Sequence, residues 1–152
     1  MTELWNTDTR GVITLPSGRM IRGRGLRYDL PEGQNPTFAV HLMGHQPPEP
    51  QWDSLWVTWR DFWLPADPVD AMRKLRTAYD RAANERVEVC CGGGVGRTGT
   101  ALSAICIFEG MDPKAAVKWV RQNYHARAVE VPWQRRFLWQ VFAADGSGRH
   151  RQ

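Results

Sequence analysis

The sequence predicts a single α/β domain, a three-layer sandwich in which helices cover both faces of a central, mostly parallel sheet. Three observations lead to this fold class. The chain has 152 residues, which is close to the size of one ordinary domain. Short β-type segments fill its first half, and helix, strand and three further helices follow. No internal repeat is visible, so we place one domain at residues 1–144 and a flexible tail at 145–152.

Short runs of β-branched and aromatic residues predict five strands. Turn residues such as Pro16-Ser17-Gly18 separate these runs. The segment 44–53 holds three prolines, so it is expected to be a loop. The strands are expected at residues 11–15, 19–28, 37–43, 54–59 and 87–91.

Four helices are predicted in the second half. Two of them start at an Asp-Pro pair, because Asp caps the first free amides and Pro fits the first helical turn. A third is apolar nearly all round and is therefore expected to be buried, with Gly110 ending it. A proline also opens the last helix. The helices are expected at about 67–84, 98–109, about 112–124, and from 132 onward.

Composition narrows the class of protein. The chain is 42% hydrophobic and 24% charged, and three cysteines do not make a paired disulfide set. No apolar run reaches the length of about 18 residues that a membrane span needs. The first residues lack the basic and apolar regions of a signal peptide. We therefore expect a cytoplasmic protein with free thiols and no membrane partner.

The formal net charge of +4 raises the question of a nucleic-acid partner. Several arginines lie close together in the first half, but glycines interrupt the run and no nucleic-acid recognition motif accompanies it. We expect a solvated strand face here and no nucleic-acid partner. The arginines are Arg19, Arg22, Arg24 and Arg27.

A glycine-rich turn between the last predicted strand and the buried helix is the segment that carries chemistry. Successive backbone amides in such a turn can point inward, and the helix N-terminus adds a positive partial charge. The turn is therefore predicted to bind an anion such as phosphate. Its residues are Gly92, Gly93, Gly94, Val95, Gly96 and Arg97.

Two nucleotide-binding interpretations compete for this turn. A Walker A loop needs four residues between its glycines and a lysine after the second one, and Arg97 stands where that lysine would be. A dinucleotide fingerprint matches at Gly94, Gly96 and Gly99. That fingerprint should lead to a second strand, whereas a helix start follows, so dinucleotide binding stays the weaker alternative.

A third interpretation uses every residue of the segment. Cys91 lies at the end of the strand, where the amides and the helix N-terminus favour a nucleophilic thiolate. The same amides bind phosphate oxygens, and Arg97 completes the cradle with a bidentate contact. Thr98 is expected to donate its hydroxyl to the sulfur and to help Cys91 leave in a second step.

The run Val-Cys-Cys-Gly-Gly-Gly-Val-Gly-Arg-Thr-Gly-Thr resembles the signature loop of the protein-tyrosine phosphatase superfamily, C-x5-R-[ST]. The sequence looks most like small bacterial members of the conventional and dual-specificity branch. The resemblance implies phosphate monoester hydrolysis through a cysteinyl-phosphate intermediate, without metal or other cofactor. It also implies a phosphorylated protein or a small phosphomonoester as substrate, and it leaves the oligomeric state open.

The chemistry also needs an acid for the leaving oxygen. The candidates in the region before the loop are Asp53, Asp61, Asp67 and Asp70. Residues 59–65 resemble the family's mobile acid loop, W-P-D-x-x-x-P, which favours Asp61 as acid and then base. Asp67 is expected to cap a helix, and Asp70 to complement the dipole of that helix.

Residues 129–137 resemble the family's glutamine loop, which orients the hydrolytic water. Gln134 matches its second glutamine, and Glu130 stands where the first would be. A carboxylate beside a phosphoryl group needs a partner, and we expect Arg127 or Arg135 to supply it. Trp63 and Trp133, the latter within 129–137, are candidates to line the pocket for an aryl phosphate.

Two further departures from the family pattern keep a rival interpretation open. Cys90 replaces the usual histidine before the nucleophile, and Arg60 replaces the middle proline of the acid loop. Together with Glu130 these changes allow a module that binds phosphate without turnover. Cys90 and Cys106 are either small buried residues or thiols that respond to oxidation.

Overall fold

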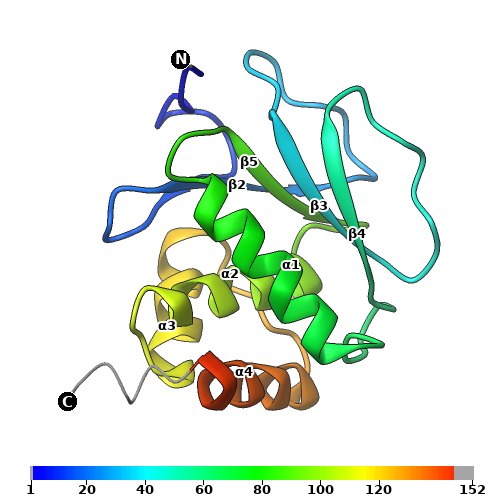
Figure 1. The fold of residues 1–152 in the computed structure, drawn as a ribbon, viewed down its shortest axis with the longest axis vertical. Helices are drawn as coiled ribbons and strands as arrows, with labels where there is room; N and C mark the ends of the chain where they lie inside the picture. Colours follow the sequence, from blue (N-terminus) through cyan, green and yellow to red (C-terminus); the bar gives the residue numbers. More distant parts are fainter. Residues whose placement is uncertain (1, 146–152) are drawn as a thin grey trace.

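A five-stranded sheet and four helices form the fold in a computed structural model of the protein, which describes residues 2–145 (Figure 1). The strand order is β1-β2-β5-β3-β4; β1 runs antiparallel to β2, and the other neighbours are parallel. The elements are β1 (Val12–Thr14), β2 (Met20–Gly25), β3 (Phe38–Met43), β4 (Asp53–Thr58), α1 (Pro68–Arg81), β5 (Val87–Cys91), α2 (Gly96–Phe108), α3 (Pro113–Asn123) and α4 (Pro132–Asp145). The predicted single α/β domain with a mostly parallel sheet is confirmed.

The helix starts follow the local chemistry of the sequence. The side chain of Asp67 accepts a hydrogen bond from the Asp70 amide at 3.1 Å and caps α1. Asp112 accepts from the Ala115 amide at 2.8 Å and caps α3 in the same way. Helix α2 begins at Gly96, two residues before the predicted start, because the glycine-rich turn is already helical there.

The two faces of the sheet are covered differently. The side chains of Val87, Val89 and Cys91 belong to the main core, together with residues of α1 and α2. All four helices lie on this side of the sheet (Figure 1). On the other side, the indole of Trp5 donates to the Val87 carbonyl at 3.0 Å. Irregular chain thus forms the layer in which we expected a helix.

The helix-free face of the sheet holds a buried ion cluster. The carboxylate of Glu88 contacts the guanidinium of Arg22 at 2.5 Å and that of Arg24 at 2.9 Å. The side chains of Glu88 and Arg22 are fully buried, and that of Arg24 is 11% exposed. The expectation of a solvated strand face is therefore wrong for Arg22 and Arg24. The cause is the parallel register, which places Arg22 beside Glu88.

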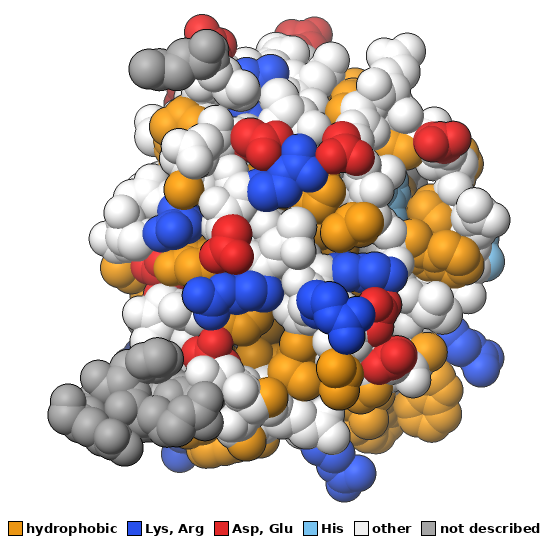
Figure 2. Space-filling model, in the orientation of Figure 1, with side chains coloured by type: hydrophobic (Ala, Val, Ile, Leu, Met, Phe, Trp, Pro, Cys, Tyr) orange, Lys and Arg blue, Asp and Glu red, His pale blue; other side chains and the backbone are white. Residues whose placement is uncertain are grey.

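The outer face of α1 carries ion pairs between neighbouring turns. Basic and acidic side chains alternate over this part of the surface (Figure 2). The pairs are Asp70–Lys74 and Arg76–Asp80 within α1, and Arg81–Glu85 between its last residue and the segment that follows.

The chain end differs from the prediction at one position. Asp145 belongs to α4 and pairs with Arg76 at 3.1 Å, so the predicted tail does not begin there. The rest of that tail, 146–152, lies outside the described residues. Within residues 2–145, no helix is long and apolar enough to cross a membrane.

Replacing Glu88 with Gln should lower the free energy of unfolding by about 3–5 kcal/mol, because it leaves the buried Arg22 charge without its counter-charge. Urea denaturation followed by tryptophan fluorescence measures the change. As a control, Asp80→Asn removes the exposed Arg76–Asp80 pair on α1 and should cost less than about 1 kcal/mol. Equal stability of the two variants would contradict a structural role for the cluster.

Candidate active site

The glycine-rich turn links the end of β5 to the start of α2 and passes close to the end of β2. Gly94 has a φ of +74°, in the left-handed region that favours glycine. A β-carbon there would lie 2.5 Å from the Gly25 nitrogen and 2.8 Å from the Arg24 carbonyl carbon. The turn can therefore pack against β2 only because position 94 has no side chain.

The sulfur of Cys91 lies inside this turn and accepts two hydrogen bonds. The Gly94 amide donates at 3.2 Å and the Thr98 hydroxyl at 3.1 Å. Cys91 is 2% exposed, and the N-terminus of α2 begins a few residues later. Hydrogen-bond donors and a helix N-terminus both stabilise a negatively charged sulfur. The sulfur thus lies as a hydrogen-bond acceptor inside the turn, close to the start of α2.

The side chain of Arg97 is fixed from one edge. Its Nη1 donates to the carbonyls of Leu42 at 3.1 Å and Trp59 at 3.0 Å. Its Nε has no hydrogen-bond partner within residues 2–145, although it is buried. Nη2 lies 3.4 Å from the position that a β-carbon on Gly92 would occupy. The Nε and Nη2 groups of the planar guanidinium are therefore available to donate hydrogen bonds to an anion above the turn.

The loop that carries Asp61 closes on itself around Trp59. The Trp59 indole is buried and donates to the Trp63 carbonyl at 2.7 Å, while Trp59 also pairs with Pro65 across the base of the loop. The Asp61 carboxylate lies 3.6 Å from the Arg97 Nε, and its side chain is 47% exposed. The loop thus brings a solvent-accessible carboxylate to the edge of the anion cradle.

The tip of this loop is tied to α4. Phe62 adopts a left-handed φ of +59°, which is strained for a bulky residue. Its amide donates to the Asp61 carboxylate at 3.0 Å, and its carbonyl accepts a hydrogen bond from the Trp133 indole. Trp63 and Trp133 pack edge to face, with ring centroids 5.9 Å apart. These contacts hold Asp61 in place from the α4 side.

The other acid candidates are occupied elsewhere. Asp53 and Asp70 each pair with a basic side chain of α1 at 2.8 Å, and Asp67 caps that helix. Among these four aspartates, Asp61 alone lies beside Arg97.

Gln134 is buried in the first turn of α4 and holds the preceding segment. Its carbonyl oxygen accepts from the amides of Glu130 at 2.8 Å and Val131 at 3.3 Å. Its Nε2 has no hydrogen-bond partner in the part of the chain that the structure describes. Gln134 therefore positions Glu130 through the backbone and keeps one free donor.

The carboxylate of Glu130 lies against Gly96, where a β-carbon would collide with its Oε1. This places a negative charge at the N-terminus of α2, beside the anion cradle. The expected ion pair is wrong: among the described residues, neither Arg127 nor Arg135 lies within 4.0 Å of this carboxylate.

Arg27, which the sequence analysis assigned to a solvated strand face, contributes to the site. Beyond β2 the chain continues over the turn, where the Arg27 amide donates to the Gly92 carbonyl at 3.0 Å. Its guanidinium lies within 3.6–3.9 Å of the β-carbon positions of Gly92 and Gly93. It forms no ion pair with any described residue. A second guanidinium therefore faces the cradle, close to Arg97.

Tyr124 is a second contributor that we did not predict. Its hydroxyl donates to the Gly94 carbonyl at 2.6 Å, and its ring occupies the space where Gly23 lacks a side chain. Burial raises the pKa of the Tyr124 hydroxyl, with the nearby Cys91 sulfur adding to the shift, so the hydroxyl stays a donor. A glycine inside a strand, here Gly23, is the sequence signal for such a close approach of another side chain to the strand.

The two other cysteines lie away from the Cys91 sulfur. Cys90 points to the opposite face of β5, where its thiol contacts the Val40 carbonyl at 3.7 Å. Burial raises the pKa of the Cys90 and Cys106 thiols. Cys106 follows Thr98 by eight residues of α2, about 12 Å along the helix axis. That spacing is too long for a Cys91–Cys106 disulfide.

Comparison with known families decides the identity of this fold. Residues 40–140 match the family model described as the Swiss Army Knife protein, DSP-PTPase phosphatase domain. The chain belongs to this family of phosphatase domains. The match covers residues 59–65, the glycine-rich turn and residues 129–137. The dinucleotide alternative fails, because α2 leads into helix α3 where that fold requires a strand.

Solved structures share the fold of this chain. The crystal structure of Tk-PTP in the active form aligns with a TM-score of 0.66 and 20% identity, over 88% of this chain and 97% of that chain. A glycine-to-alanine mutant form of Tk-PTP aligns with a TM-score of 0.60 and 22% identity, over 70% and 76%. PTPMT1 aligns with a TM-score of 0.52 and 13% identity, over 76% and 82%. No curated protein sequence matches this chain significantly.

Replacing Trp133 with Phe should loosen the acid loop, because the variant keeps an aromatic ring but loses the hydrogen bond to the Phe62 carbonyl. We expect the amides of residues 61–64 to exchange with deuterium about two- to tenfold faster. Trp139→Phe is the matched control, since Trp139 is exposed on the same helix and packs against Phe142. Unchanged exchange in Trp133→Phe would mean that α4 does not hold the loop.

Proposed function

We propose that the phosphatase domain hydrolyses phosphate monoesters through a cysteinyl-phosphate intermediate, with protein phosphotyrosine as the preferred substrate. The observation that carries this proposal is the pairing of Cys91 with Arg97. The sulfur accepts two hydrogen bonds, and the guanidinium is anchored through Nη1. Its Nε, 3.6 Å from the Asp61 carboxylate, and its Nη2 donate no hydrogen bond to a described residue. One group suits nucleophilic attack and the other suits the phosphoryl oxygens.

In the first step the Cys91 thiolate attacks phosphorus and forms the S–P bond while the bond to the ester oxygen breaks. The amides of residues 92–97 and the fork of Arg97 hold the three remaining oxygens. Asp61 gives its proton to the departing oxygen, so a neutral alcohol or phenol leaves. The 3.6 Å distance between the Asp61 carboxylate and the Arg97 Nε supports this role, because Arg97 is the side chain proposed to hold the phosphoryl group.

In the second step water attacks phosphorus and the S–P bond breaks. The Asp61 carboxylate takes a proton from the water, and inorganic phosphate forms. The Cys91 sulfur leaves as a thiolate, which the Thr98 hydroxyl stabilises through its 3.1 Å hydrogen bond. Glu130, which lies against Gly96, and Gln134, whose buried Nε2 has no partner among the described residues, are the side chains that we expect to orient this water.

Exposed aromatic side chains beside the acid loop favour an aryl phosphate. Phe62 and Trp63 are about half exposed, and Trp133 is 38% exposed. An aromatic ring gains stabilisation from edge or offset contacts with such side chains. This rim supports phosphotyrosine over phosphoserine or phosphothreonine as the substrate of the domain.

A second candidate function is a module that binds phosphate without turnover. The observation in its favour is the Glu130 carboxylate, which lies at the N-terminus of α2 with no cationic partner among the described residues. A negative charge there opposes a phosphate dianion. Arg27 offsets this repulsion, because its guanidinium also faces the cradle.

The Cys91→Ser variant tests the mechanism. Turnover of an aryl phosphate, measured with EDTA present, should fall below about one-thousandth of the wild-type rate because the thiolate nucleophile is lost. Cys106→Ser is the matched control and should keep the wild-type rate. Turnover that survives Cys91→Ser would end the cysteinyl-phosphate mechanism. Phosphate binding without turnover by the wild type would favour the binding module.

The Asp61→Asn variant tests the acid. With phenyl phosphate, kcat should fall about 10²–10⁴-fold, and the decline of the rate on the basic side of the pH profile should disappear. A nitrophenyl phosphate should lose much less, since its acidic phenol leaves without a proton. Asp53→Asn is the control, because Asp53 pairs with α1. An unchanged basic limb in Asp61→Asn would assign the acid to another residue.

A further inference from the structure

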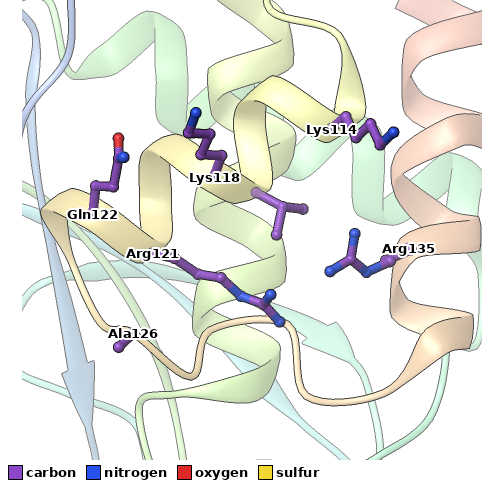
Figure 3. Close-up of a pocket in the computed structure, with 7 residues that line it drawn as sticks. Lys114, Lys118, Arg121, Gln122, Ala126 and Arg135 are labelled. Carbon is purple, nitrogen blue, oxygen red and sulfur yellow. The ribbon is translucent and has the colours of Figure 1, made fainter.

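A basic groove lies between α3 and α4, outside the anion cradle. It has a volume of about 300 Å³ and holds four cationic side chains and no acidic one. Lys114, Lys118 and Arg121 project from α3, and Arg135 reaches toward them from α4 (Figure 3). The site already described uses none of these four residues.

The charges of this groove are not neutralised within residues 2–145. Lys114, Lys118 and Arg135 form no ion pair with a described residue. This contrasts with α1, where basic side chains alternate with acidic partners. Unpaired charges of one sign held on two packed helices produce a local positive potential. The groove therefore attracts an anionic partner.

Arg121 connects the groove to the active site. Its guanidinium donates to the carbonyls of Ala128 and Val129, both at 2.8 Å, just before Glu130. A second cavity, of about 550 Å³, contains Phe62 and Glu130 and shares Arg121 with the basic groove. A chain that leaves the mouth of the phosphate cradle past Phe62 can thus continue into the groove.

The lining of the groove favours a polypeptide over a nucleic acid. It contains no aromatic side chain on which a base could stack, and Val117 supplies an apolar contact between the charges. Two of the three lysines of the chain lie here, one helical turn apart on α3. Such separated point charges suit carboxylates spaced along an extended segment.

We propose that this groove is a docking site for an acidic segment of the phosphoprotein substrate, close to the phosphorylated residue. The proposal rests on the proposed function and names the class of substrate. Each exposed lysine–carboxylate contact contributes little alone, so recognition needs several contacts and weakens as salt increases. The cradle binds the phosphate, and the groove selects among phosphoproteins.

The test compares two phosphotyrosine peptides, one with acidic flanks and one with neutral flanks, at low ionic strength. The wild type should turn over the acidic peptide with a kcat/KM about tenfold higher. In the Lys114→Gln/Lys118→Gln variant, the ratio of kcat/KM for the acidic peptide to that for the neutral peptide should fall about fivefold. High salt should lower this ratio in the wild type by a similar factor. Turnover of a small aryl phosphate should be unchanged, because the variant leaves the cradle intact.

The matched control is Arg73→Gln/Arg136→Gln, which removes the same charge from exposed positions that do not line the groove. It should keep the peptide preference. Two outcomes would contradict the docking proposal while leaving aryl phosphate hydrolysis intact. In one, the wild type and the groove variant prefer the acidic peptide equally. In the other, the wild type shows no preference for the acidic peptide.

Failure of the proposed function gives a different result. The wild type would then not hydrolyse aryl phosphate, and fluorescence anisotropy with the acidic peptide would test the groove directly. Binding that weakens in the groove variant alone would support the docking site without catalysis. Absence of peptide binding, or binding of a single-stranded oligonucleotide or anionic vesicles in its place, would overturn the proposal.

Discussion

The placement of one sulfur and one guanidinium depends on a single constraint, the tight turn between β5 and α2. The turn aims the Gly94 amide at Cys91, and the first turn of α2 presents Thr98 to the same sulfur and Arg97 to the space above it. Carbonyls from β3 and from the start of the acid loop then fix one edge of Arg97. Because these anchors come from distant parts of the chain, the cradle forms only when the sheet and the acid loop are both in place.

The helix-free face of the sheet supports this geometry from below. Glu88 lies on the same strand as Cys91 but points to the other side, where it binds Arg22 and Arg24 of β2. This ion cluster aligns β2 with β5, and the continuation of β2 brings Arg27 to the mouth of the turn. The two faces of β5 therefore have separate roles. One carries the proposed nucleophile, and the other fixes β2, which leads into the segment with Arg27.

Local patterns in the sequence were enough for the strands, the helix starts and the glycine-rich turn. Caps such as Asp67 and the turn around Gly94 depend on neighbours a few residues away, so their chemistry is readable in the sequence. Arg22 was misread because its burial depends on pairing with a strand 66 residues later. The layer formed by irregular chain was missed for the same reason, since tertiary packing decides which segment covers a sheet face.

Glu130 shows how the charges around the cradle are balanced. A carboxylate at this position weakens the attraction of the α2 N-terminus for a phosphate dianion, and no described cation pairs with it. Arg27 supplies a positive charge from the segment after β2, over Gly92 and Gly93. Since the side chains of Arg27 and Glu130 are exposed, water screens their effects, and the buried Arg97 is the dominant charge at the proposed phosphate site. Arg27 and Glu130 are therefore better placed to tune which esters enter the proposed phosphate site than to decide whether phosphate binds there.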